Sequence, residues 1–273
     1  MTGVALSDKA SIAQGRGGAV SVPRPLPNAM VRVLSLFGLL VFWWALAWLK
    51  SDPMVLPGPQ IVLPRLWAEA VSGALWLHLG ATLWRVVQAF VAAMSLGLVL
   101  GILMGLLPRL NRWLDPWLVF FLNLPALVVI VLCFLWIGLN ETAAIVAVAI
   151  NKIPLVTAMM REGARALNGQ LADMAQVFGM SRMARLRHIL LPQLAPHLAS
   201  TARSGLSLIW KIVLVVEFLG RGQGVGFKIH LHFQMFDVTM VMVYALSFIA
   251  VMLAIETLIV QPLEARARRW RDA

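Results

Sequence analysis

Residues 171–192 read LADMAQVFGMSRMARLRHILLP and form the longest polar and basic interruption in an otherwise apolar sequence. The stretch divides into two helix-compatible segments that meet at Gly179. Asp173 lies early in the first segment, where a carboxylate suits the positive end of a helix dipole. Gly179 suits a left-handed position just after a helix, and Ser181 can cap a second helix by accepting from its free N–H groups. The stretch therefore predicts a helix–turn–helix hairpin.

The second helix of this hairpin is amphipathic. Its apolar residues share one face and its arginines lie largely elsewhere. The apolar set is Met183, Leu186, Ile189 and Leu190, and the basic set is Arg182, Arg185 and Arg187. Pro192 and Pro196 follow, and we expect them to prevent an uninterrupted continuation, because proline removes a helical hydrogen bond. On these residues alone, the hairpin could simply lie on a membrane surface.

The composition indicates a polytopic membrane protein. The 273 residues are 60% hydrophobic and only 13% charged, whereas soluble domains carry about 25% charged residues. The formal net charge of +11 does not point to nucleic acid, because the basic residues lie beside apolar runs, where loop charge bias explains them. The single cysteine, Cys133, lies inside an apolar run and has no partner for an intrachain disulfide.

Six apolar runs are long enough to cross a bilayer as helices of roughly 20 residues. They lie at about 31–49, 81–107, 118–137, 142–160, 198–219 and 238–260. The expected fold is therefore all-α, with about six transmembrane helices.

The connections between these runs are expected to be short. Residues 57–64 (PGPQIVLP) predict an extended segment that leads to a surface helix, and residues 108–116 predict a basic loop. Residues 138–141 predict a tight turn and residues 220–227 a glycine-rich loop, while Pro125 is expected to break the third span.

The chain ends are expected to be tails. Residues 1–29 are rich in Gly, Pro, Ser and Ala and cannot bury a core, so they predict a disordered tail. Residues 30–264 form the expected transmembrane domain, which includes a polar loop at 161–195, and residues 265–273 form a basic tail. The first apolar run is expected to be a retained span, because the tail before it is long for a signal peptide.

The distribution of Lys and Arg predicts the orientation. Fifteen fall on one side of the predicted spans: Lys9, Arg16, Arg24, Arg32, Arg109, Arg112, Arg161, Arg165, Arg182, Arg185, Arg187, Arg266, Arg268, Arg269 and Arg271. Four fall on the other side: Lys50, Arg65, Arg221 and Lys228. The positive-inside rule therefore places both termini and the hairpin in the cytoplasm.

Gly97, Gly101 and Gly105 recur every four residues in the second apolar run. Small residues at this interval let a second helix approach closely in lipid. The alternative is that the glycines are merely tolerated. We expect this stripe to be a helix-packing face.

Several ionisable residues fall within or near the predicted spans. Charge inside a bilayer is costly and usually has a partner or a water path. The candidates are Arg85, Lys152, Arg203, Lys211 and Glu217, with Gln88 and Glu256 as further polar residues. Arg85 and Lys211 lie near span ends and could snorkel to the interface, whereas Lys152 is deep enough to face a cavity.

The excess of positive over negative residues in the spans suggests a pathway that favours anions, through Arg85, Lys152 or Lys211. Glu217 either lines a pathway or gate, or forms a structural bond that holds an external loop. The sequence alone does not choose between these two roles.

Nucleotide and metal sites are not expected on this chain. The loop at 220–227 lacks Gly-Lys-Ser/Thr, and its glycines do not fit G-x-G-x-x-G. His230 and His232 form an H-x-H pair on an expected external loop, but two ligands without a third make a weak metal site. We expect no metal and no catalytic residue.

The hairpin resembles a known motif. Asp173-Met174-Ala175, then Gly179, then Ile189-Leu190-Leu191-Pro192 match the spacing of the EAA loop of ABC importer permeases: E-A-A, three residues, G, nine residues, I-x-L-P. The chain departs at the first two positions, with Asp for Glu and Met for Ala. In that family the loop is a cytoplasmic coupling helix that docks on the ATPase subunit. The resemblance implies coupling residues Asp173, Met174, Ala175, Gly179, Ser181, Arg182, Ile189, Leu191 and Pro192.

Two further segments resemble the permeases for nitrate, taurine and alkanesulfonates. Residues 135–141 (LWIGLNE), after Asn123-Leu124-Pro125, are similar to the "P…LWFGxGE" segment of that subfamily. Residues 203–226 resemble its "GLR…W…AE…GLG" stretch, in which Glu217 takes the A-E position, although Ser207 stands where the family has arginine. The likeness covers about residues 57–262.

This resemblance implies a permease subunit of a type I ABC importer in the inner membrane. Its implied partners are a pair of ABC ATPase subunits, a periplasmic solute-binding protein, a second permease copy and the lipid bilayer. ATP and Mg would belong to the ATPase, so this chain would carry no cofactor and would not be an enzyme. The implied cargo is a small anion such as a sulfonate, taurine or nitrate. The alternatives are a gradient-driven secondary transporter or channel, and a membrane anchor without a pathway.

Overall fold

The computed structural model describes residues 28–263. It contains two compact units, which divide inside helix α1 (Asn28–Lys50), between Trp43 and Trp44. Each unit is considered by itself. The described part of the first unit is the helix at 28–43. Most of the predicted tail at 1–29 and the whole of the basic tail at 265–273 lie outside the described residues.

The second unit is built from helices, and residues 28–263 contain no strand, so the predicted all-α fold is confirmed. The helices are α2 (Pro59–Val71), α3 (Ala74–Leu106), α4 (Pro108–Leu122), α5 (Ala126–Ile137), α6 (Glu141–Arg165), α7 (Gly169–Val177), α8 (Arg182–Arg185), α9 (Leu191–Gly220), α10 (Val225–Gln234) and α11 (Val238–Ile255). Two π-helical segments occupy Leu186–Leu190 and Glu256–Val260.

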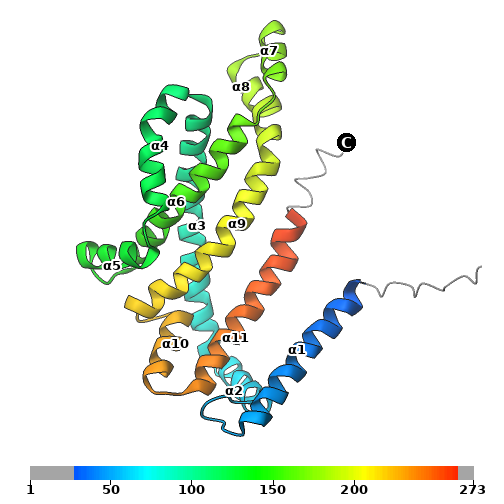
Figure 1. The fold of residues 1–273 in the computed structure, drawn as a ribbon, viewed down its shortest axis with the longest axis vertical. Coiled ribbons are helices and arrows are strands. Elements are labelled where there is room, and N and C mark those ends of the chain that lie inside the picture. Colours follow the sequence, from blue (N-terminus) through cyan, green and yellow to red (C-terminus); the bar gives the residue numbers. More distant parts are fainter. Residues whose placement is uncertain (1–27, 264–273) are drawn as a thin grey trace, which may run out of the picture. The chain divides into compact units, whose positions relative to one another are not determined.

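The core of this unit is the contact between α3 and α6, onto which α9 packs (Figure 1). The glycine stripe makes the contact possible. A Cβ added to Gly97 would come 2.6 Å from the Cβ of Val156, and one added to Gly101 would come 2.6 Å from the Cβ of Met160. Gly105 makes a similar approach to α6. The stripe therefore lies in the contact between α3 and α6, where any side chain at these positions would push the helices apart.

Three helices in the described range are long and apolar enough to cross a membrane: α3, α6 and the helix at Val238–Leu263. A fourth span results if α4 and α5 count as one bent pair. The expected number of six spans is therefore not confirmed. α9 has 30 residues, but Arg203, Lys211 and Glu217 lower its hydropathy. The apolar part of α1, Leu34–Lys50, is shorter than the other candidates.

The predicted loop at 108–116 is wrong, whereas the predicted break of the third apolar run at Pro125 is present. Residues 108–122 form the continuous helix α4, because Pro108 lies at its first turn, where a missing N–H costs nothing. The third run is two helices that meet at 94°. Pro125 lies at the junction, where it precedes α5 and cannot donate to a continuing helix.

Two other loop predictions change. The predicted extended segment at 57–64 is mostly helical, because α2 already begins at Pro59. The helix that was predicted to follow this segment is present. The glycine-rich loop is shorter than expected and ends at Gly224, so His230 and His232 lie on α10 and not on a loop. Figure 1 shows α10 and α2 at the end of the unit opposite to α7 and α8.

The prediction that Pro192 and Pro196 interrupt the helix is also wrong. α8, the π-helical segment and α9 follow one another without a break. In the π segment the Leu191 N–H donates to the Leu186 carbonyl, five residues back. This wider turn starts a new register, so Pro192 falls in the first turn of α9, where proline is tolerated.

Candidate functional site: an exposed hairpin and a buried polar network

The hairpin, residues 169–190, has the predicted local structure. Gly179 takes a left-handed backbone angle φ of +61°, and the Met180 N–H donates to the Ala175 carbonyl, which closes the end of α7. The Ser181 hydroxyl caps α8 by accepting from the Ala184 N–H at 3.2 Å. The helix–turn–helix is therefore confirmed, and each of its ends is defined by short-range hydrogen bonds.

The tip of the hairpin is apolar and exposed. Val177 and Phe178 are 84% and 76% exposed, and Met183 is also exposed, whereas Ala175 is fully buried. Asp173 is exposed on the same short helix. Contiguous exposed apolar residues with polar neighbours are typical of an interaction surface. The arrangement suits docking into a partner.

Gln193 connects the two ends of the hairpin, a role that the sequence analysis missed. Its side-chain oxygen accepts from the Asn168 N–H at 2.9 Å, at the entrance to α7. Its amide nitrogen donates to the Ile189 carbonyl at 3.2 Å, at the exit. One side chain therefore joins the start of α7 to the start of α9. No spacing pattern marks a lone glutamine for such a role.

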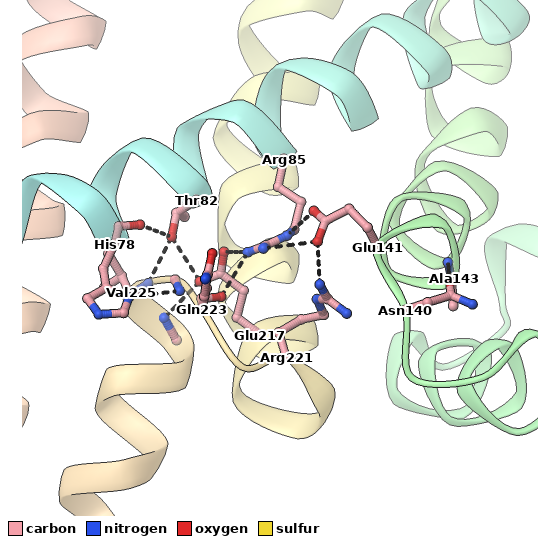
Figure 2. A network of polar contacts seen from close by, with 12 residues as sticks. His78, Thr82, Arg85, Asn140, Glu141, Ala143, Glu217, Arg221, Gln223 and Val225 are labelled. Atoms are coloured by element: carbon pink, nitrogen blue, oxygen red, sulfur yellow. Dashed lines mark hydrogen bonds and ion pairs between the residues drawn. The ribbon is translucent and has the colours of Figure 1, made fainter.

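The second region is a buried polar network (Figure 2), and Arg85 on α3 is its centre. Arg85 is only 3% exposed, so it does not snorkel. Its guanidinium pairs with Glu217 of α9 and with Glu141 at the start of α6, and it also donates to the Gln223 carbonyl. Four of its five N–H donors are thereby used.

Glu217 is fully buried, and both of its carboxylate oxygens accept hydrogen bonds. Besides Arg85, its carboxylate accepts from the Thr82 hydroxyl at 2.9 Å and from the Gly226 N–H at 2.8 Å. Gly224 packs so closely against this carboxylate that a Cβ there would overlap it. These contacts match the loop-holding role, one of the two that the sequence left open for Glu217.

The network extends to both sides of this ion pair, as Figure 2 shows. Thr82 also accepts from the Val225 N–H at 2.8 Å, and His78 Nδ1 accepts from the Gly224 N–H at 3.2 Å. On the other side, Arg221 donates to Glu141 at 2.6 Å. The network therefore joins α3, α6, α9 and the loop before α10 at one end of the helix bundle.

The other ionisable candidates do not belong to this network. Arg203 pairs with Glu256 at 2.7 Å, which links α9 to the π segment after α11. Lys152 is half-buried on α6, and Lys211 is exposed on α9. Among residues 28–263, neither lysine has an assigned ion pair. The same range holds no cluster of metal-ligating side chains.

The comparisons with known proteins agree with this architecture. Residues 97–270 match the family model "Binding-protein-dependent transport system inner membrane component". The chain is 30% identical to the putative aliphatic sulfonates transport permease protein SsuC of Escherichia coli, over 91% of this chain and 96% of that protein. It is 30% identical to the taurine transport system permease protein TauC of E. coli, over 85% and 86%. It is also 31% identical to the riboflavin transport system permease protein RibX of Chloroflexus aurantiacus, over 87% and 88%.

Solved structures show the same fold. A chain from the crystal structure of an amino acid ABC transporter with histidines superposes with a TM-score of 0.60 at 18% identity, covering 74% of this chain and 97% of that chain. A chain of the inward-facing MetNI methionine ABC transporter gives 0.53 at 19% identity, covering 73% and 98%. The chain therefore belongs to the family of binding-protein-dependent transport system inner membrane components, and it is the permease subunit of an ABC importer.

Proposed function

We propose that this permease works as a pair of identical subunits and imports an organic anion of the sulfonate class across the inner membrane. A periplasmic solute-binding protein delivers the anion, and a pair of ATPase subunits, which hold ATP and Mg, drives the cycle. Both termini and the hairpin face the cytoplasm, in keeping with the positive-inside rule. The observation that carries the coupling part of this proposal is the exposed apolar tip of the hairpin, Val177 and Phe178, above a base that the Gln193–Asn168 hydrogen bond closes.

The hairpin is the coupling element in this proposal. Its apolar tip enters a groove of the ATPase, and Asp173 and Arg182 contact the rim of that groove. When ATP closes the ATPase pair, the hairpin carries the movement to α6 and α9 as a rigid body. The hydrogen bonds of Gln193 support this role, because they tie both ends of the hairpin to the start of α9.

The charge of the spans supports an anionic cargo. Lys152 and Lys211 have no assigned ion pair within the described residues, in contrast to Arg85, whose charge is offset by two carboxylates. Relatives at 30% identity are described as permeases for aliphatic sulfonates and for taurine. The two lysines would lower the cost of moving a sulfonate through low-dielectric surroundings.

Co-purification tests the coupling role. The tagged chain is extracted from its native membrane in mild detergent beside an Asp173→Lys/Gly179→Val variant. The expected result is an ATPase that accompanies the wild type and is lost from the variant. Absence of any ATPase from folded wild-type chain would contradict the proposal and favour a gradient-driven transporter.

Uptake into proteoliposomes containing the whole transporter tests the cargo. Lys152→Ala and Lys211→Ala should each lower uptake of taurine or an alkanesulfonate about tenfold, since a charge-assisted contact contributes about 1.5–3 kcal/mol. Arg65→Ala on α2 is the control and should transport normally. Unchanged uptake of every anion by both lysine variants, or preferential uptake of riboflavin, would reject an anion pathway through these residues.

A further inference from the structure

Two adjoining cavities lie between α3, α4 and α6, away from the buried polar network. One is an apolar groove of about 270 Å³, lined by side chains of all three helices. Leu100, Leu114, Trp117 and Ile153 are among them. The other is a polar cavity of about 560 Å³, beside the connection between α3 and α4. Met104 lines both cavities, so they follow one another along the same helices.

The polar cavity carries an excess of positive charge. Arg112 and Arg165 line it, together with Asn111 and a single carboxylate, Asp115. Asp115 is already paired with Arg161, which also donates to the Asn111 side chain. The charge of Asp115 is therefore offset, and two arginines remain to attract an anion.

The two arginines are accessible to a ligand. Arg112 is exposed and has no assigned ion pair within residues 28–263. Arg165 pairs with Glu162 at 3.2 Å, but both side chains are well exposed. An exposed pair contributes little to stability, roughly 0–1 kcal/mol, so a phosphate can displace Glu162 at small cost.

The apolar groove contains one polar atom that lacks a partner. Thr157 is buried on α6, and its hydroxyl makes no hydrogen bond within the part of the chain that the structure describes. A buried hydroxyl without a partner is costly. Thr157 also lines the apolar groove, so an ester carbonyl of a bound lipid that reached this hydroxyl would accept its hydrogen bond. Trp117, exposed at the rim of the groove, is a residue type that favours the headgroup level of a bilayer.

We propose that these two adjoining cavities bind an anionic phospholipid. Its phosphate lies between Arg112 and Arg165, and one acyl chain lies along Leu114 and Ile153. Basic pockets between membrane helices suit anionic headgroups, and a zwitterionic headgroup would bring its ammonium next to the same arginines. The inference goes beyond the import function and does not depend on which solute is carried.

Lipid retention by the purified full-length chain tests the headgroup site. The chain is equilibrated in detergent with phosphatidylglycerol and phosphatidylethanolamine, and retained lipid is measured by mass spectrometry. Wild type should enrich phosphatidylglycerol about tenfold, since charge-assisted contacts contribute about 1.5–3 kcal/mol. Arg112→Gln/Arg165→Gln should abolish the enrichment. Arg65→Gln/Arg109→Gln removes the same charge outside the cavity and should keep it; equal loss in both variants would overturn the site.

A second pair of variants tests the acyl groove. Leu100→Trp fills the groove and should reduce retention of phosphatidylglycerol, whereas Val99→Trp, on the neighbouring exposed position, should not. Displacement of the lipid by inorganic phosphate alone would show a free-anion site and overturn the proposal. So would a disulfide-linked dimer of Trp117→Cys in a Cys133→Ala background, because a second copy would then cover the groove.

Discussion

The hairpin and the buried polar network differ in almost every physical respect. The hairpin is exposed and ends in an apolar tip. Except for the Gln193–Asn168 bond at its base, it is held by hydrogen bonds between residues a few positions apart. The network is buried, joins residues more than 130 positions apart, and pairs nearly every charge it contains. The difference indicates two separate roles. The hairpin is suited to binding a partner, and the network stabilises one end of the helix bundle.

The largest effect is expected at Glu217. Glu217→Leu leaves Arg85 buried beside a single carboxylate and should lower stability by about 3–5 kcal/mol, the usual cost of breaking a buried pair. Thermal unfolding in detergent measures it. Glu256→Leu breaks the partly exposed pair with Arg203 and should cost far less. Equal losses of stability in the two variants would show that burial adds nothing to the cost of breaking an ion pair here.

The second largest loss of stability is expected in the contact between α3 and α6. Gly101→Ala places a methyl group 2.6 Å from the Met160 Cβ and should cost about 1–3 kcal/mol through overpacking. Gly80→Ala is the matched control on the same helix, because nothing lies within 4 Å of its added Cβ. A neutral Gly101→Ala would mean that α3 and α6 separate without cost.

A substitution at Gly179 should impair coupling to the ATPase without lowering the stability of the helix bundle. Gly179→Val strains the left-handed turn by about 1–2 kcal/mol, and this strain is local to the hairpin. We expect an unchanged melting temperature of the bundle and a loss of ATP-driven uptake. Gly169→Val, also free of neighbours but without a positive φ, is the control and should transport normally. A lower melting temperature for Gly179→Val would contradict the independence of the two regions.

The smallest effect is expected at Ser181. Ser181→Ala removes the cap of α8 and should destabilise that helix by about 0.5–2 kcal/mol. Hydrogen exchange of the amides at 182–185 should quicken, while exchange at the network stays as in wild type. Ser181→Asp restores an N-cap acceptor and should reverse the change, which distinguishes capping from a general effect of substitution.

Short-range chemistry explains what could be read from the sequence. The Gly179 turn, the Ser181 cap and the glycine stripe follow from residue type and spacing within a few turns. The partners of Arg85 could not be found this way, because Glu141, Glu217 and Thr82 meet only in three dimensions. The break around Pro125 was anticipated, but its 94° angle was not, since packing decides which way a broken helix turns.

The two hydrogen bonds of Gln193 have a consequence for timing. One amide group joins the last residues before α7 to the last residues before α9. A displacement of the hairpin therefore acts on α9 directly and on α6 through residues 166–168. We expect the two ends of the hairpin to move together and not one after the other.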